Sequence, residues 1–549
     1  MTFRQLSLLG TCVALLAAAP ALAREDDSPR EQGWKEFISA PLAAEFATKP
    51  SLRNAAELND RKALEKFYAA RDNLPLWLQD GMLNERARKA IAFLQNVGDY
   101  GLDPVLYPTP AIDLGKGEPA SATDLVAAEI QLSSSLLAYA RHAQAGRLNP
   151  ASLSKNLTPS PVPPNPRDVM KALSADGDVS KILASYNPPH REFEALRQKY
   201  VELRDSMKSK GDDIVIPRGR LLRPGMSDAR VELIKRRLGI AVPPPEQAIP
   251  AELDLYDGEV VEAVKTFQSA NNLKPDGVIG PATLSAMNST DHDRLVTIQA
   301  NLERWRWLPR DLGKRHVWVD IPGFMVHVVD GGSDVYSGRI VVGKANNQTP
   351  IFSDQFEYIE VNPFWNVPSS IAAKEIMPEV VMDPDYLRRA NLEVVYGDDN
   401  NQAIRLDPWS IDWYMVDPNN MPFRFRQPPG RGNALGNIKF MFPNKHDVYL
   451  HDTPARSLFD RSQRAYSHGC VRLHEPMEFA RALLSFEPDL TLAQVSAEIK
   501  SRRNKALGMT SRIPVHLTYF TARVGADGEV EYLNDVYGHD RLVASALGI

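Results

Sequence analysis

The feature that most constrains the fold is a change in the period of apolar residues near residue 316. Before that point apolar residues recur at three- and four-residue steps, as in 54–71 and 124–146, which is the spacing of amphipathic helices. From 316 onward "HVWVDIPGFMVHVV" alternates, and "SGRIVVG", "EYIEVNP" and "DVYLHD" are rich in strand-forming residues. The length of 549 residues also favours several domains. We therefore expect a multidomain α+β protein whose first part is helical and whose second part is mainly β and sandwich-like.

Residues 24–215 form the first expected unit, an α-helical scaffold. Its amphipathic segments contain no cluster of side chains that indicates chemistry, and the Pro-rich stretch 159–168 must be extended. A later segment, 291–312, places Leu295 and Ile298 on one helical face. We expect this later helix to complete the scaffold.

Residues 216–290 form a second expected unit, a small module of three helices. Val231 and Ile234 share one helical face, and Val261 and Val264 repeat the pattern. The blocks "RPGMSDARVELIKRRLGI", "GEVVEAVKTFQ" and "DGVIGPATLSAM" occur here in order. Together they resemble the peptidoglycan-binding domain of bacterial wall enzymes.

The first 23 residues have the features of a secretory signal peptide. Arg4 precedes an apolar run that closes with "ALA" before a polar segment. An uncleaved anchor is the alternative, because the run approaches membrane-spanning length. Cleavage after Ala23 would remove Cys12 and leave Cys470 as the one cysteine of the mature chain, with no stable transmembrane segment. In an exported protein such a cysteine is a reactive thiol, an intermolecular partner or a buried inert thiol.

The charge balance gives no reason to expect a nucleic-acid partner. The 64 basic residues face 69 acidic ones, a net charge of −5, and removal of Arg4 with the signal peptide makes it −6. Nucleic-acid binding relies on an excess of basic residues.

The segment "VYLHDTPARSLFDRSQRAYSHGCVRLHEP" holds the candidate chemistry, because it combines Cys470 with His451 and His468. The thiolate is the nucleophilic form, and a cysteine with a pKa of about 8.5 is mostly protonated at neutral pH. A nearby histidine can accept that proton. Gly469 lies between His468 and the cysteine and predicts a tight turn, at which the two side chains diverge. His451 follows "VYL" and can arrive from an adjacent strand, so we expect it to be the base.

This segment resembles the catalytic signature of the YkuD-type L,D-transpeptidases, in which "HDTP" precedes "SHGCVRL". The blocks "NLERWRWLP", "NPFWNVP" and "YFTARVGADG" further resemble large Gram-negative members that carry a scaffold and a wall-binding module. The likeness covers about 35–545. It implies an enzyme that acts in the periplasm.

The resemblance assigns roles to the matching positions. Cys470 is expected to be the nucleophile and His451 the general base and acid, its ring oriented by the backbone carbonyl of Asp452. His468 and Gly469 are expected to shape the loop, whose N–H groups, including that of Cys470, would form an oxyanion hole.

Further positions are expected to contact the substrate. The planar guanidinium of Arg472 suits a carboxylate or would hold the loop. The other candidates for lining the site are Ser467, Asp452, Tyr449 and Trp365.

The resemblance also implies the reaction and its partners. A tetrapeptide stem would acylate the cysteine with loss of D-Ala, and the side-chain amine of a second stem would take the acyl group, which gives a 3→3 cross-link. The implied partners are stem peptides, glycan strands and wall-synthesis enzymes, carbapenems would inhibit the enzyme, and no cofactor is expected. An L,D-carboxypeptidase and an enzyme that attaches a protein to peptidoglycan are alternatives with the same site.

Other chemistries fit the sequence less well. His451, His468, Cys470 and His474 could supply zinc ligands, but no H-x-x-x-H or C-x-x-C frame accompanies them, so we expect no metal. The "SLSK" at 152–155 matches S-x-x-K, but the S-D-N and K-T-G of penicillin-binding enzymes are missing. A structural wall-binding protein with an inactive domain conflicts with the paired Cys and His.

The catalytic domain is expected over 313–510. Within it, about 374–445 is rich in Pro, Asn and Gly and poor in strong strands, so we expect an insertion that covers the substrate. The remaining residues, 511–549, predict a hairpin around "ADG" at 526–528, followed by a tail.

Overall fold

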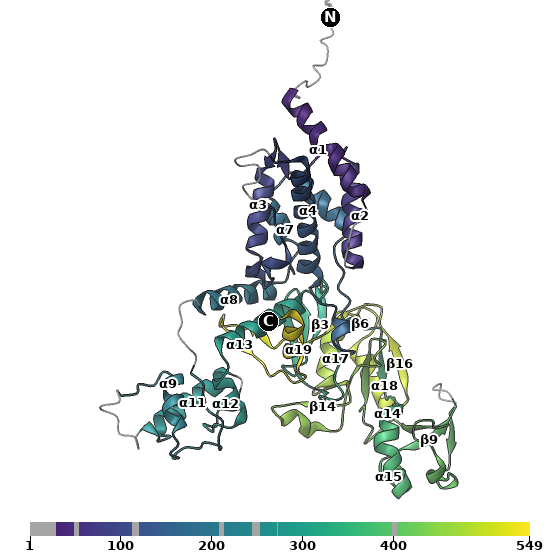
Figure 1. The fold of residues 1–549 in the computed structure, drawn as a ribbon. Helices are drawn as coiled ribbons and strands as arrows, with labels where there is room; N and C mark the ends of the chain where they lie inside the picture. The colour runs from purple at the N-terminus through teal and green to yellow at the C-terminus, as the bar shows by residue number, and fades with distance from the viewer. Residues whose placement is uncertain are drawn as a thin grey trace, which may run out of the picture.

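The structure is a computed structural model that describes residues 29–48, 54–111, 120–207, 214–243, 253–271, 273–397 and 403–549. The predicted signal peptide and Cys12 lie outside these described residues. Helices make up the N-terminal part, and a β-rich body follows, with a helical module on one side and a small lobe on the other (Figure 1). No helix among the described residues is long and apolar enough to cross a membrane. The expected multidomain α+β architecture is confirmed.

The scaffold helices pack around one hydrophobic core, which includes the fully buried side chains of Trp77 and Tyr139. The longest helix is α4 (Ala122–Ala145), and it begins with a capping box between Ser121 and Asp124. The other helices of this part are α1 (Pro29–Ala47), α2 (Ala55–Ala69), α3 (Glu85–Gln95), α5 (Pro150–Leu153), α6 (Pro166–Ser174), α7 (Val179–Ala184) and α8 (Arg191–Met207).

The module of residues 216–290 has a core of its own, supplied by the predicted apolar faces. Val231, Ile234 and Val264 are fully buried in it, so the prediction of these helical faces is confirmed. Figure 1 shows the module apart from the N-terminal helices. Its described helices are α9 (Arg230–Arg237), α11 (Gly258–Ala270) and α12 (Pro281–Met287).

The helix α13 (Asp291–Trp305) leads from the module into the β-rich body and packs against α8. A capping box between Thr290 and Asp293 starts it. Ile298 and Leu302 are fully buried in a cluster with side chains of α8 and of the C-terminal segment. The helix therefore bridges the scaffold and the body.

The body is one eleven-stranded sheet in the order β16-β7-β12-β13-β15-β5-β4-β3-β17-β6, with β14 paired to β5. It curls around a core that α17 (Pro476–Leu484) and α18 (Leu492–Ser501) help to close. The expected sandwich-like body is thus a single curled sheet. Its strands are β3 (Arg315–Asp320), β4 (Met325–Asp330), β5 (Ser333–Gly343), β6 (Phe352–Gln355), β7 (Tyr358–Val361), β12 (Ile438–Met441), β13 (Leu450–His451), β14 (Ala465–Ser467), β15 (Val471–Leu473), β16 (Lys505–Gly508) and β17 (Pro514–Thr518).

The insertion forms a lobe with its own four-stranded sheet, in the order β10-β9-β11-β8. Val380 and Phe425 are fully buried in its core, and Figure 1 shows it at the end of the molecule marked by α15 and β9. Its elements are β8 (Trp365–Asn366), α14 (Ser369–Ile371), the π-helix η3 (Ala372–Ile376), α15 (Met377–Met382), α16 (Tyr386–Arg389), β9 (Glu393–Tyr396), β10 (Ile404–Leu406) and β11 (Arg424–Gln427).

The predicted boundaries of this insertion, about 374–445, are wrong at both ends. The lobe begins earlier than residue 374, because β8 pairs with β11 in the lobe sheet. β12 pairs with β7 and β13 in the main sheet, so the lobe ends before residue 438. The expectation that this segment is poor in strong strands gave no sign of the four-stranded sheet. The lobe strands span only two to four residues each, which is too short for alternation to stand out in sequence.

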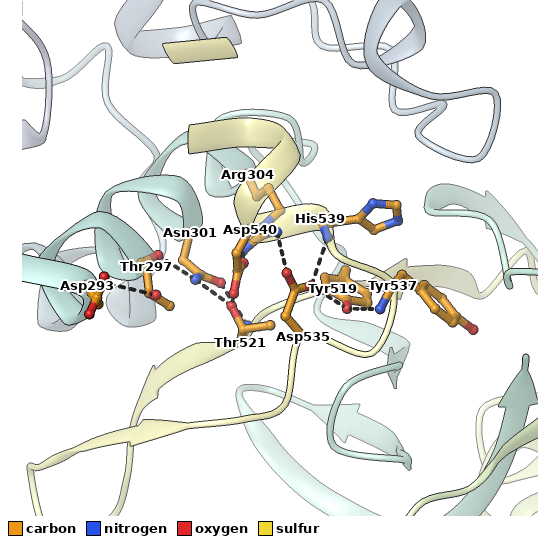
Figure 2. A network of polar contacts seen from close by, with 10 residues as sticks. All are labelled: Asp293, Thr297, Asn301, Arg304, Tyr519, Thr521, Asp535, Tyr537, His539 and Asp540. Atoms are coloured by element: carbon orange, nitrogen blue, oxygen red, sulfur yellow. Dashed lines mark hydrogen bonds and ion pairs between the residues drawn. The ribbon is translucent and has the colours of Figure 1, made fainter. Parts of the chain in front are cut away.

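The C-terminal segment is part of the body. β17 lies between β3 and β6 in the main sheet. The prediction that 511–549 is a hairpin and tail outside the catalytic domain is wrong for the residues of β17. The hairpin around 526–528 is confirmed by β18 (Ala522–Val524) and β19 (Val530–Tyr532). The last helix, α19 (His539–Leu547), packs against α13, and polar contacts join the two helices (Figure 2).

Candidate active site

The strand register places four polar side chains on one face of the sheet. β13 and β15 run parallel, with His451 opposite Arg472, and the Val471 N–H donates to the Tyr449 carbonyl. Successive residues of a strand face opposite sides, and Val471 is fully buried in the core. The side chains of Tyr449, His451, Cys470 and Arg472 therefore share the other face.

His451 is a buried imidazole fixed by the backbone. Its Nδ1–H donates to the Asp452 carbonyl at 2.5 Å, which leaves Nε2 as the acceptor of the ring. Burial, together with the positive charges of Arg472 and Lys439, lowers the pKa of His451 to about 3, although the hydrogen bond to Asp452 opposes the shift. The ring is therefore neutral at pH 7, as a general base must be.

The Asp452 carboxylate holds the turn that orients His451. It accepts the backbone N–H of Asn437 at 2.9 Å and that of Thr453 at 2.7 Å, and it pairs with Arg456. A Cβ at Gly436 would lie 2.2 Å from this carboxylate. The side chain is thus used inside the turn, and the backbone carbonyl is the group that contacts the histidine.

The Cys470 thiol is enclosed by its neighbours, although the residue keeps partial exposure, and it forms no disulfide. It donates to the Asp447 carbonyl at 3.7 Å. Burial raises the pKa of the thiol above its ordinary value of 9.0, and this outweighs the lowering effects of the hydrogen bonds from Tyr449 and of the charges on Lys439 and Arg472. The resting site therefore holds a neutral thiol and a neutral imidazole on the same face of the sheet.

Hydrogen bonds fix the turn that carries the nucleophile. Ser467 Oγ donates to the Cys470 carbonyl at 2.6 Å and accepts the Gly469 N–H at 3.1 Å. Gly469 has a φ of +123°, a conformation that favours glycine, and its carbonyl accepts Thr349 Oγ1–H at 2.7 Å. The Gly469 N–H is thus occupied, whereas the Cys470 N–H has no partner among the described residues. It is the N–H that remains for an oxyanion.

His468 faces the insertion lobe. Its Nε2 lies 2.6 Å from the Glu375 carboxylate on the π-helix η3, and Lys344 Nζ lies 3.3 Å from the same nitrogen. Single π-helical turns are rare and are frequent at functional sites. The loop-shaping role of His468 stays a prediction, and these contacts give it a physical basis by joining the nucleophile loop to the lobe.

Arg472 and Tyr449 border the thiol, whereas Trp365 belongs to the lobe. Arg472 Nε is buried without a hydrogen-bond partner among the described residues, so the guanidinium retains capacity for a carboxylate. The Tyr449 hydroxyl contacts the thiol, and Lys439 Nζ lies 4.1 Å from the centre of the Tyr449 ring. Trp365 packs against the core of the lobe.

Comparisons with known proteins show which families the segments of this chain match. Residues 314–490 match a family described as the L,D-transpeptidase catalytic domain. The chain contains an L,D-transpeptidase catalytic domain. Residues 62–199 match a family described as "Scaffold domain", and residues 227–287 match one described as "Putative peptidoglycan binding domain".

Individual relatives carry the same name as the catalytic domain. A curated Haemophilus influenzae protein named "Putative L,D-transpeptidase" is 35% identical over 227 residues, which are 41% of this chain and 45% of that protein. The chain thus spans less than half the length of this relative. Two solved structures are each 13% identical. An L,D-transpeptidase from Mycobacterium smegmatis covers 37% of this chain and 58% of its own, with a TM-score of 0.17. An L,D-transpeptidase from Xylanimonas cellulosilytica covers 55% and 99%, with a TM-score of 0.16.

Several residues around Cys470 and His451 come from segments that sequence reasoning did not single out. Lys439 stands opposite His451 on β12. Asp447 has a φ of +53° and supplies the carbonyl that accepts the thiol. A lysine on a strand and an aspartate in a turn are ordinary in sequence, so no local pattern marks them. Thr349 and Glu375 were missed for the same reason, since only the folded chain brings them to the nucleophile loop.

A metal site is the alternative interpretation of the histidines and Cys470. Among the described residues, no group of three or more His, Cys, Asp or Glu side chains is placed to hold an ion. His474, one of the histidines considered for zinc, lies with Nε2 3.0 Å from Arg339 and its ring packed on Phe459.

A basic cleft of about 700 Å³ is lined in part by the turn that follows β13. Asp452 lines it and is paired with Arg456. Arg431, Lys500 and Arg502 also line it and are exposed, and within the described part of the chain their side chains have no ion pair or hydrogen bond. The cleft therefore carries net positive charge, which suits an anionic ligand.

Proposed function

We propose that this protein is a peptidoglycan L,D-transpeptidase that forms 3→3 cross-links through a Cys470 thioester. One arrangement carries the proposal. Cys470 and His451 share a face of two parallel strands, and His451 is neutral with its Nδ1 held by a backbone carbonyl. The matched catalytic domain supports the same reaction.

The first step is acylation of the cysteine by a tetrapeptide stem. His451 Nε2 takes the thiol proton as Cys470 Sγ attacks the carbonyl carbon of the diaminoacid at its L-centre. The C–N bond to the terminal D-Ala breaks, His451 gives the proton to the departing amine, and a thioester remains. Both groups start uncharged, so charge develops only during the attack, when the Cys470 N–H can stabilise the oxyanion.

The second step transfers the acyl group to an amine. The side-chain amine of a second stem's diaminoacid attacks the thioester, and its proton passes through His451 to the departing sulfur. The products are an amide cross-link and the free thiol, so the exchange is divided into two accessible steps. A lobe that covers the thioester would exclude water and favour the amine over hydrolysis.

Substrate recognition would use positive charge near this face. Arg472 has a buried Nε without a partner among the described residues, and the basic cleft offers further cations for the carboxylates of a stem peptide. We place the enzyme in the periplasm, exported by residues 1–23, with stem peptides, glycan strands and wall-synthesis enzymes as its partners. The module of residues 227–287 would hold the wall.

The products formed from tetrapeptide-rich sacculi test this function. Muropeptide analysis after incubation with the purified chain should show 3→3 dimers and released D-Ala, and Cys470→Ala should give neither. Tripeptides without dimers would identify water as the acceptor, and protein-linked stems would identify an attachment enzyme. Unchanged muropeptides in the presence of folded wild-type protein would refute the proposal.

A further inference from the structure

A continuous run of buried hydrogen bonds connects the nucleophile loop to the C-terminal segment. Thr349 Oγ1 donates to the Gly469 carbonyl at 2.7 Å and accepts the Gly343 N–H at 2.9 Å. The Tyr537 hydroxyl donates to the Gly343 carbonyl at 2.7 Å and accepts the Thr349 N–H at 3.2 Å. Thr349 is 0% exposed and Tyr537 is 9% exposed. The two hydroxyls thus hold both ends of the loop 343–349, which lies against the nucleophile loop.

The far end of this run is anchored on α13 and α19. In Figure 2 the Tyr537 N–H donates to the Tyr519 hydroxyl at 2.8 Å, and that hydroxyl donates to Asp535 at 2.8 Å. Asp535 also accepts the Asp540 N–H at 3.0 Å, and Asp540 pairs with Arg304 of α13. Tyr537 therefore has a fixed place relative to the scaffold.

The position of the Gly469 carbonyl decides where the Cys470 N–H points. The two groups belong to one peptide unit, which is planar and trans, so they point in opposite directions. Thr349 holds the carbonyl on the side of the 343–349 loop, and the N–H is directed away from it. Glycine imposes little conformational restraint of its own, so this orientation must come from neighbouring groups.

Ser467 does not supply this restraint. Its hydroxyl contacts the Gly469 N–H and the Cys470 carbonyl. Those groups belong to the peptide units before and after the one that joins Gly469 to Cys470. Among the described residues, the Thr349 hydroxyl is the side-chain group that bonds to the intervening unit.

We infer that Thr349 and Tyr537 are positioning residues for the nucleophile loop. Thr349 aims the Cys470 N–H at the oxyanion that forms during acylation, and Tyr537 holds Thr349 in place. Neither residue needs to touch the substrate. The inference rests on the proposed function, because it concerns the acylation of Cys470.

Variants that delete one hydroxyl at nearly constant volume test the inference. Thr349→Val and Tyr537→Phe remove the two positioning groups, and Thr349→Ser keeps the first. Thr518→Val is a matched control. This buried threonine lies on β17, away from the site, and its hydroxyl donates to the Val319 carbonyl with an O–O distance of 3.0 Å. Tyr139→Phe is the second control, since this scaffold hydroxyl donates to a carbonyl at 3.3 Å and accepts an amide N–H at 2.8 Å.

Three measurements are made on each full-length variant: the rate of Cys470 acylation at saturating disaccharide tetrapeptide or carbapenem, the rate of Cys470 alkylation by iodoacetamide followed by peptide mapping, and Tm. Alkylation forms no oxyanion, so it reports on the thiol alone. Loss of a whole oxyanion donor lowers the catalytic rate roughly 100- to 1000-fold. We therefore expect Thr349→Val to slow acylation at least about tenfold with alkylation unchanged, and Tyr537→Phe to show a smaller loss of the same kind. Thr349→Ser should restore the rate, and the controls should lose only stability.

Equal acylation rates in Thr349→Val and the wild type would overturn the inference. Parallel losses of acylation and alkylation would also overturn it, because they would indicate a collapsed loop. If Thr349→Val does not fold, the comparison of Tyr537→Phe with Tyr139→Phe decides the same question. If the wild type itself forms no adduct, the proposed function fails, and the inference fails with it.

Discussion

The pH dependence of Cys470 alkylation tests whether the resting site is a neutral pair or a thiolate–imidazolium pair. The chain from residue 24 onward retains one of the two cysteines, so iodoacetamide incorporation reports on Cys470. Burial raises the pKa of this thiol above its ordinary value of 9.0 and lowers that of His451 to about 3. Both shifts favour the uncharged form.

The size of the effect follows from these shifts. With a thiol pKa above 9.0, less than about 1% of the protein carries a thiolate at pH 7. The alkylation rate should then rise about tenfold per pH unit between pH 6 and pH 9. An ion pair would instead give a rate that is nearly constant over this range.

A variant sharpens the test. Lys439 lowers the pKa of the Cys470 thiol through its charge, so Lys439→Met should slow alkylation at every pH below about 9. Lys89→Met, at an exposed position of the scaffold, is the control and should match the wild type. Intact mass at timed intervals gives the rates. A plateau below pH 8, or a midpoint near pH 6, would refute the neutral pair.

Three further predictions concern the surroundings of the nucleophile. The pKa of His451 in the folded chain is about 3, below its ordinary value of 6.5. Below pH 6.5 the unfolded chain therefore binds more protons at this residue than the folded chain does. The free energy of unfolding, which is at its full value above pH 6.5, falls as the pH is lowered toward 3. Chemical denaturation should show ~3 kcal/mol less acid destabilisation between pH 6.5 and pH 4 in His451→Gln than in the wild type, and an equal loss in both would contradict a buried neutral ring. Glu375→Gln removes the partner of His468 and should change unfolding free energy by less than about 1 kcal/mol. It should nevertheless raise the share of hydrolysis over transfer, and an unchanged product ratio would exclude a covering role for the lobe. Reversing the cleft charges with Arg431→Glu, Lys500→Glu and Arg502→Glu should raise KM for stem peptides at least about tenfold at low salt with kcat retained, and an unchanged KM would remove the cleft from substrate binding.

Sequence reasoning succeeded where a signal is local. The change of period near 316 correctly separated the helical part from the sheet, and the stripe at Val231 and Ile234 correctly marked the core of the module. Residues 526–528 are turn-forming residues, and the predicted hairpin lies there. Such patterns depend on neighbours in sequence, so they need no knowledge of the fold.

The remaining features depend on segments that meet only after folding. β17 joins the main sheet by pairing with β3 and β6. Both partners lie far from it in sequence, so no local pattern predicts the pairing. Lys439 acts on the nucleophile from an adjacent strand, and Thr349 reaches Gly469 from a loop 120 positions away. A single lysine or threonine has no periodicity, so its role follows from strand register and loop packing rather than from local pattern.

Intact-mass analysis of the wild-type chain mixed with a tetrapeptide stem tests the central claim most directly. The account predicts an adduct equal to the stem minus D-Ala, located on Cys470 by peptide mapping. The adduct should be absent from Cys470→Ala, and it should form roughly 100-fold more slowly or worse in His451→Gln. An adduct on a different residue, or turnover of the stem by folded Cys470→Ala, would contradict the account.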